Sequence, residues 1–126
     1  MSKDILIVIR HGPYGGFQAA EGLRHANGAI SLGFRPVVLL VDDGVYLAKT
    51  DQNPGQTKWL ALSETLEEIV ARGLYEKKDE PAEFYVEKES LSNRGLEPEE
   101  LVESMEIVDQ EKVSHLFALN RIQLIF

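Results

Sequence analysis

The chain has 126 residues, 44% of them hydrophobic and 27% charged, and its formal net charge is −8. This length predicts a single domain over 1–126, while the negative charge and the lack of an apolar run of about 18 residues argue against direct nucleic-acid binding and a membrane span. The chain has no cysteine, which excludes disulfides, a cysteine nucleophile and persulfide carriage on this chain.

Two aliphatic runs rich in β-branched residues, at 4–10 and 35–42, are typical of parallel strands that are buried on both faces. The segment between them, 17–33, has apolar residues at helical spacing and stops at Gly33, which suits a left-handed C-terminal cap. Strand, helix and strand in this order predict a right-handed crossover.

The rest of the chain continues the alternation of strands and helices. Residues 45–56 are rich in Asp, Asn, Pro and Gly and are expected to form a long irregular loop. The elements expected after it are a helix at 57–74 capped near Gly73, a strand at 83–89, helical turns at 90–96 and 97–101, a strand at 104–109, a helix at 110–121 and a strand at 122–126. This order predicts an α/β fold of three layers, a mostly parallel five-stranded sheet with helices on both faces, as in flavodoxin-like and Rossmann-like domains.

In such folds, ligands gather beyond the carboxyl ends of the strands, where three loops of this chain are expected to meet. Because parallel strands end at one edge, we expect Glu87 at that edge, partly exposed and near the first two loops. The candidate residues for a ligand site there are His11, Gly12, Tyr14, Gly15 and Gly16 from the first loop, Asp42, Asp43 and Gly44 from the second, and Glu87 from the third.

The glycine-rich first loop precedes a helix, so weak anion binding is one interpretation. Its spacing departs from G-x-G-x-x-G, no Lys-Ser/Thr pair follows, and Pro13 has no N–H, so we favour a tight corner between strand and helix. His11 beside Asp42 or Asp43 suggests an acid–base pair or a sparse metal site. The chain has no G-x-S-x-G motif and no metal-ligand spacing, and therefore no enzyme activity, metal or cofactor is expected.

The expected loop after the second strand carries apolar and aromatic side chains. Tyr46 and Leu47 lie near its start, and Trp59 lies at its far end. Such side chains on an exposed loop tend to mark a contact surface. We therefore expect an oligomer, with these three residues as interface candidates.

Several motifs in a fixed order give the chain a resemblance to a known family. They are "ILIVIRHGPYG", "LLVDDGVY", "VEKESLSNRGL" and a last strand that ends in Phe126. Together they resemble the DsrE/DsrF-like proteins, in particular the DsrF/TusC branch, over almost the whole chain. The resemblance implies a small subunit of a cytoplasmic sulfur-relay assembly of the DsrEFH/TusBCD type. In these assemblies sulfur passes as cysteine persulfide, for tRNA thiolation or for sulfur oxidation.

The resemblance also implies a role for this subunit. In the cysteine-bearing branch the acceptor cysteine follows the third strand in a segment that ends in Arg-Gly, which places Glu87 at or near that position, upstream of Arg94 and Gly95. A chain without cysteine is then expected to be a non-catalytic partner, in a homo-oligomer and/or a hetero-oligomer with cysteine-bearing DsrE-like subunits. No export signal is visible, so a cytoplasmic location is expected. The alternative function is a stand-alone module that binds a small ligand or anion with the first two loops; a hydrolase or metal-dependent enzyme ranks last.

Overall fold

The computed structural model describes residues 4–52, 61–75 and 79–126. Its five strands form one sheet in the order β4-β3-β2-β1-β5, and every neighbouring pair is parallel. The strands are β1 (Asp4–Ile9), β2 (Arg35–Leu40), β3 (Glu83–Glu87), β4 (Glu106–Val108) and β5 (Ile122–Ile125). The predicted α/β fold is thus confirmed, and its sheet is wholly parallel.

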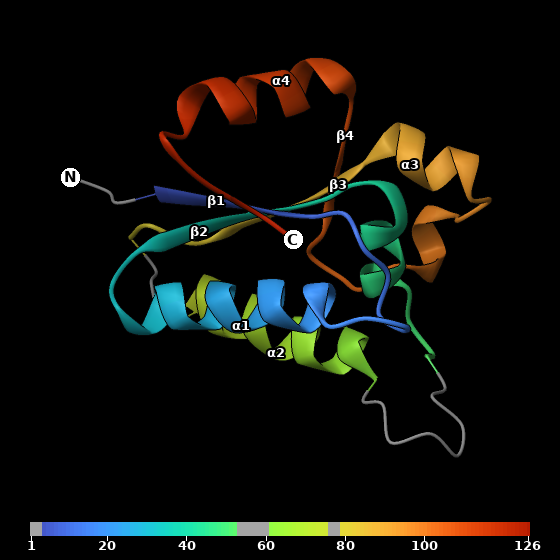
Figure 1. The fold of residues 1–126 in the computed structure, drawn as a ribbon, viewed down its shortest axis with the longest axis horizontal. Helices are drawn as coiled ribbons and strands as arrows, with labels where there is room; N and C mark the ends of the chain where they lie inside the picture. Colours follow the sequence, from blue (N-terminus) through green and yellow to red (C-terminus); the bar gives the residue numbers. More distant parts are fainter. Residues whose placement is uncertain (1–3, 53–60, 76–78) are drawn as a thin grey trace.

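Helices cover both faces of this sheet. The α-helices are α1 (Gln18–Ser31), α2 (Leu62–Tyr75), α3 (Lys88–Asn93) and α4 (Gln110–Leu119), and the 3-10 segments are η1 (Asp42–Ala48) and η2 (Pro98–Glu100). Figure 1 shows α1 and α2 on one face and α4 on the other. The longest of these helices, α1 and α2, have 14 residues each, and within the described ranges no helix is long and apolar enough to cross a membrane.

The alternation of side chains along the central strands builds two cores. Ile7 and Val38 belong to the core beneath α1 and α2, while Leu6 and Leu39 belong to the core beneath α4. All four side chains are buried. The central strands therefore need apolar residues at every position, which explains the continuous runs in the sequence.

Glycines near the ends of α1 and α2 have different roles. Gly33 has φ +85°, its N–H bonds to the carbonyl of Ile30, and the next N–H bonds to the carbonyl of Ala29, which is a Schellman motif that confirms the predicted cap. Gly73 was expected to end α2, but the helix continues to Tyr75. A Cβ at Gly73 would lie 2.7 Å from the Cβ of Ala82, so this glycine instead allows α2 to pack closely beside β3.

The segment after β2 differs from the predicted irregular loop. Residues 42–48 form η1, and its apolar side chains enter the core beneath α2. Leu47 is fully buried and offers no surface to a partner, so the prediction that it is an interface residue is wrong. The physical reason is that η1 turns back over the sheet, and the Nε2 group of Gln52 holds it there by donating to the carbonyls of Tyr46 and Lys49. Trp59 lies outside the described residues.

Tyr85 is expected to make the fold less stable at alkaline pH. Its side chain is buried on the α4 face, and its hydroxyl donates a 2.7 Å hydrogen bond to Oε2 of Glu83. Burial, and after it the hydrogen bond to Glu83, raises the pKa of the Tyr85 phenol above its ordinary value of about 10. The folded state therefore keeps a proton that the unfolded state releases, and the free energy of unfolding falls as the pH rises above about 10.

The variant Tyr85→Phe tests this expectation. At neutral pH it should be less stable than the wild type by about 1 kcal/mol, because it lacks the hydrogen bond. Between about pH 8 and about pH 11 it should lose less stability than the wild type, because it has no phenol to ionise. Urea unfolding at both pH values measures the difference, with exposed Tyr75→Phe as the control. If the free energy of unfolding falls equally for Tyr85→Phe and the wild type between these two pH values, the expectation is contradicted.

Candidate functional site

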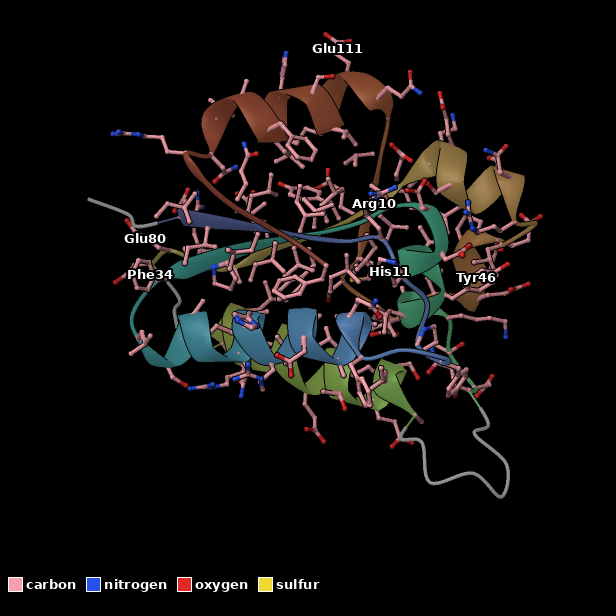
Figure 2. All side chains as sticks on the ribbon, in the orientation of Figure 1. Arg10, His11, Phe34, Tyr46, Glu80 and Glu111 are labelled. Carbon is pink, nitrogen blue, oxygen red and sulfur yellow. The ribbon has the colours of Figure 1, made fainter. Side chains whose placement is uncertain are left out.

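The carboxyl ends of the strands meet at one edge of the sheet, as predicted. Ile9 lies beside Leu40, Leu40 beside Val86, and Glu87 beside Val108. The loops after β1, β2 and β3 therefore start side by side. Arg10, His11 and Tyr46 all lie at this end of the sheet in Figure 2.

The first loop, 10–17, makes a corner between β1 and α1. Gly15 has φ +90°, a conformation that glycine adopts without steric cost. Phe17 occupies the N-cap position of α1 and its side chain makes no capping hydrogen bond. His11 is exposed, whereas Gly12 lies against the second loop, where an added Cβ would be 3.6 Å from the carbonyl oxygen of Asp43. These features agree with the tight corner that we favoured from the sequence.

Glu87 is half-buried at the end of β3 and lines a polar hollow of about 570 Å³. We call this the acidic hollow; its lining residues are Asp42, Asp43, Glu87, Glu89, Ser90, Asn93, Arg94 and Gln110. The expected position of Glu87 beside the second loop is thus confirmed. The first loop does not line the acidic hollow.

Hydrogen bonds from Ser90 connect the second loop to the third. The Ser90 hydroxyl donates to Oε1 of Glu87 at 2.5 Å and accepts from the N–H of Asp42 at 2.8 Å. Asp42 has φ 51°, a left-handed conformation that Asp tolerates better than most residues. The network therefore holds the turn after β2 against the start of α3.

Two ion pairs complete the connections at this edge. Arg10 donates to Oδ2 of Asp42 at 3.2 Å, and Arg94 donates to Oδ1 of Asp43 at 2.9 Å. Both aspartates that could have formed an acid–base pair with His11 are thus paired with arginines. In the part of the chain that the structure describes, no three His, Asp or Glu side chains are placed to hold a metal ion.

A second hollow, of about 350 Å³, lies between the first loop and η1. We call it the tyrosine hollow; its lining residues are Gly12, Pro13, Tyr14, Asp43, Tyr46, Lys49 and Gln52. Of the sequence candidates it brings together Gly12, Tyr14, Asp43 and Tyr46, and Asp43 also lines the acidic hollow. Lys49 is its only cationic side chain among these lining residues.

Four other candidates, His11, Gly15, Gly16 and Gly44, line neither hollow. A Cβ at Gly16 would meet the side chain of Gln18, and one at Gly44 would lie 1.9 Å from the carbonyl oxygen of Ile9. Gly44 is thus a packing residue, because η1 could not approach β1 so closely with a side chain there.

Sequence reasoning missed several residues that shape this edge. Ser90 joins two loops although it is 48 positions from Asp42, and no local pattern predicts such a contact. Lys49 and Gln52 follow η1, and they were assigned only to an irregular loop. The Arg-Gly pair at 94–95 could have identified Arg94 as a residue of this edge, because Arg94 lies at the end of the third loop and forms an ion pair with Asp43.

Comparison with known proteins places this edge in a wider context. Residues 3–120 match the model of the DsrE/DsrF-like family. A protein from Pseudomonas aeruginosa described as "Protein TusC homolog" is 31% identical over 119 residues, which cover 92% of each chain. An uncharacterised protein from Methanopyrus kandleri is 32% identical over 103 residues, covering 82% of this chain and 77% of the relative.

Solved structures agree with the family match at the level of the fold. The crystal structure of the ychN protein from E. coli superposes over 100% of both chains with a TM-score of 0.80 and 21% sequence identity. A Methanobacterium thermoautotrophicum protein of unknown function superposes over 99% of this chain and 100% of its own, with a TM-score of 0.73 and 12% identity. At these identities the likeness shows a common architecture.

Proposed function

Because this chain belongs to the DsrE/DsrF-like family, we propose that it is a non-catalytic subunit of a cytoplasmic sulfur-relay complex of the DsrEFH/TusBCD type. Such a complex would serve tRNA thiolation or sulfur oxidation through cysteine-bearing partner subunits. One observation carries the proposal: the chain keeps the family fold but has no cysteine, and Glu87 ends the third strand where the resemblance expects the acceptor thiol.

The chemistry of persulfide transfer supports a non-catalytic role. The reactive group is a thiolate or a persulfide anion, and this chain supplies neither. The acidic hollow is lined by four carboxyl groups, from Asp42, Asp43, Glu87 and Glu89, against one cation, Arg94, and this excess of negative charge would disfavour an anionic sulfur nearby. The connected loops are therefore suited to support a partner rather than to carry sulfur.

We place the contact with the partner at the tyrosine hollow. Tyr14 and Tyr46 supply hydroxyl donors and flat apolar surface, and Lys49 supplies a positive charge beside them. An anionic persulfide on a partner loop would find donors there instead of unpaired carboxylates, since Asp43 is already paired with Arg94. The ion pairs at this edge would keep the surface preformed.

Co-expression with a cysteine-bearing DsrE-like protein tests the proposal. The two chains should purify together, and sulfur from a labelled persulfide donor should appear on the partner only. Tyr14→Ala and Tyr46→Ala should weaken the complex at least about tenfold, as expected for central aromatic contacts. Tyr75→Ala is the matched control, because Tyr75 is exposed at the far end of α2. Label retained on this chain under non-reducing, denaturing conditions would contradict the proposal, as would a complex that the two hollow variants leave unchanged.

A stand-alone ligand-binding module is the second candidate, favoured by the open tyrosine hollow with Lys49 in its lining. This function predicts that the isolated chain binds a small anion there without any partner. Calorimetric titration with inorganic phosphate and with sulfate distinguishes the two candidates. Binding by the wild type that Lys49→Ala abolishes would favour the module over the relay subunit.

A further inference from the structure

β5 leaves one side of its backbone open at the edge of the sheet. It pairs with β1 and has no neighbour on its other side in the strand order. Phe126, which follows β5, donates its N–H to the carbonyl of Val8 and accepts from the N–H of Arg10. Because backbone groups alternate in direction along a strand, Ile122 and Leu124 also face β1, while the N–H and C=O groups of Gln123 and Ile125 point away from the sheet.

Exposed apolar side chains lie at this edge, beside the exposed polar side chains of Arg121 and Gln123. Ile122 is 49% exposed and Ile125 is 58% exposed, on opposite faces of the strand. Leu32, at the end of α1, and Leu119, at the end of α4, are 78% and 77% exposed. A groove of about 210 Å³ runs between α1 and β5, with Leu124 in its lining. The apolar surface thus continues from the strand onto the two helices beside it.

The opposite edge of the sheet is protected against strand pairing, whereas β5 is not. β4 has only three residues, and Glu106 among them is exposed. Short strands and charged side chains are the usual protection of an edge. β5 has four residues, with no charged side chain and no proline among them. The β4 edge is therefore better protected against strand pairing than the β5 edge.

The charge distribution also separates the two edges. Residues 83–112 contain ten acidic and three basic residues, which leaves a net charge of −7 out of −8 for the whole chain. This stretch contains β3, α3, β4 and the start of α4, and β4 is the strand farthest from β5. Two copies that meet at β5 therefore keep their acidic regions at the two distant ends of the combined sheet, where repulsion is weakest.

We propose that β5 pairs with β5 of a second copy, in antiparallel orientation, about a two-fold axis at Gln123. In this register Gln123 lies opposite Gln123 of the other copy, and Ile125 lies opposite Arg121, so the outward backbone groups of both strands bond to each other. Ile122 lies opposite Leu124 of the other copy on the α1 face, which covers both side chains. The Gln123 side chain donates to the carbonyls of Phe117 and Asn120 of its own copy, so it does not occupy the two-fold axis.

A second copy fits this edge better than the β4 edge of another molecule does. Pairing of β5 with β4 would be head to tail and would leave a free β5 on every complex, so it would continue as a filament. The two-fold pairing closes after two copies. It does not depend on the sulfur relay proposed above, because it requires this chain alone.

Analytical ultracentrifugation of the purified chain tests the dimer. At tens of micromolar the wild type should sediment with twice the 14.1 kDa mass of the chain. Ile122→Lys should raise the dimer dissociation constant at least about tenfold, because it places a charge in the covered apolar contact. Gln123→Pro should do the same, since it removes an N–H that points away from β1 at the open edge. Tyr75→Lys, which removes an exposed aromatic ring elsewhere, should leave the dimer intact.

Cross-linking tests the register. The chain has no cysteine, so Gln123→Cys introduces a single thiol, which should meet its own copy across the axis at a Cα distance of about 5.5 Å. Mild oxidation should give a disulfide-linked dimer, while Glu111→Cys, at the start of α4, should not. A monomeric wild type, or a dimer that survives Ile122→Lys and does not cross-link through position 123, would overturn the proposal. Loss of relay activity with this dimer intact would instead count only against the proposed function.

Discussion

Gly44→Ala is expected to lower the free energy of unfolding by about 3 kcal/mol, the range of strong overpacking in a core. The added Cβ would lie 1.9 Å from the carbonyl oxygen of Ile9 and 2.7 Å from its carbonyl carbon. Both atoms belong to the backbone of a central strand, so no side-chain rotation relieves the contact. Either η1 moves off the sheet or β1 shifts in its register with β2.

Gly28→Ala is the matched control for this prediction. Gly28 lies within α1, and nothing comes within 4 Å of a Cβ placed there. Replacing glycine by alanine at such a helical position should raise the free energy of unfolding by about 0.5–1 kcal/mol. Urea or thermal unfolding of both variants gives the comparison. A Gly44→Ala protein as stable as the wild type would show that η1 does not lie against β1 in solution.

Leu47→Ala is expected to lower the free energy of unfolding by about 3 kcal/mol, within the range for a buried leucine. The side chain is fully buried in the core beneath α2, and no solvent-facing part of it is available to a partner. The loss should arise from apolar area returned to water and from the cavity left behind. It should appear with the isolated chain, whatever partners are present.

The same substitution separates the two interpretations of this segment. If Leu47 lay on an exposed loop, as the sequence suggested, Leu47→Ala would weaken assembly and leave the stability of the subunit unchanged. Denaturant unfolding and ultracentrifugation on one sample measure both quantities. Phe17→Ala, in which an exposed aromatic side chain is removed, is the control and should change stability by less than about 0.5 kcal/mol.

The predicted elements succeeded where a pattern was long and local. The continuous aliphatic runs of β1 and β2 identified strands covered on both faces, and Gly33 identified the end of α1. The prediction failed for η1, because a 3-10 segment of seven residues has the turn-rich composition of a loop while its apolar side chains pack inward. It failed again at Gly73, where glycine serves a tertiary contact rather than a helix end.

The candidate site was likewise predicted in part from the sequence and in part only seen in the structure. Parallel strands end at one edge, so the meeting of the loops after β1, β2 and β3, and the position of Glu87, followed from the order of elements alone. The sequence did not show that Asp42 and Asp43 would pair with Arg10 and Arg94. Those partners lie 32 and 51 positions away, and side-chain pairing over such distances depends on how the loops pack.

The sequence by itself determined the α/β architecture, the absence of any thiol chemistry and the family, because hydrophobic periodicity, composition and ordered motifs are properties of the chain. Only the tertiary structure decided which residues face solvent: it buried Leu47, divided the carboxyl edge into an acidic and a tyrosine hollow, and left β5 uncovered. The physical reason is that exposure depends on which elements pack against each other. Strand order, which leaves β5 at an edge, is set by contacts between residues far apart in the chain.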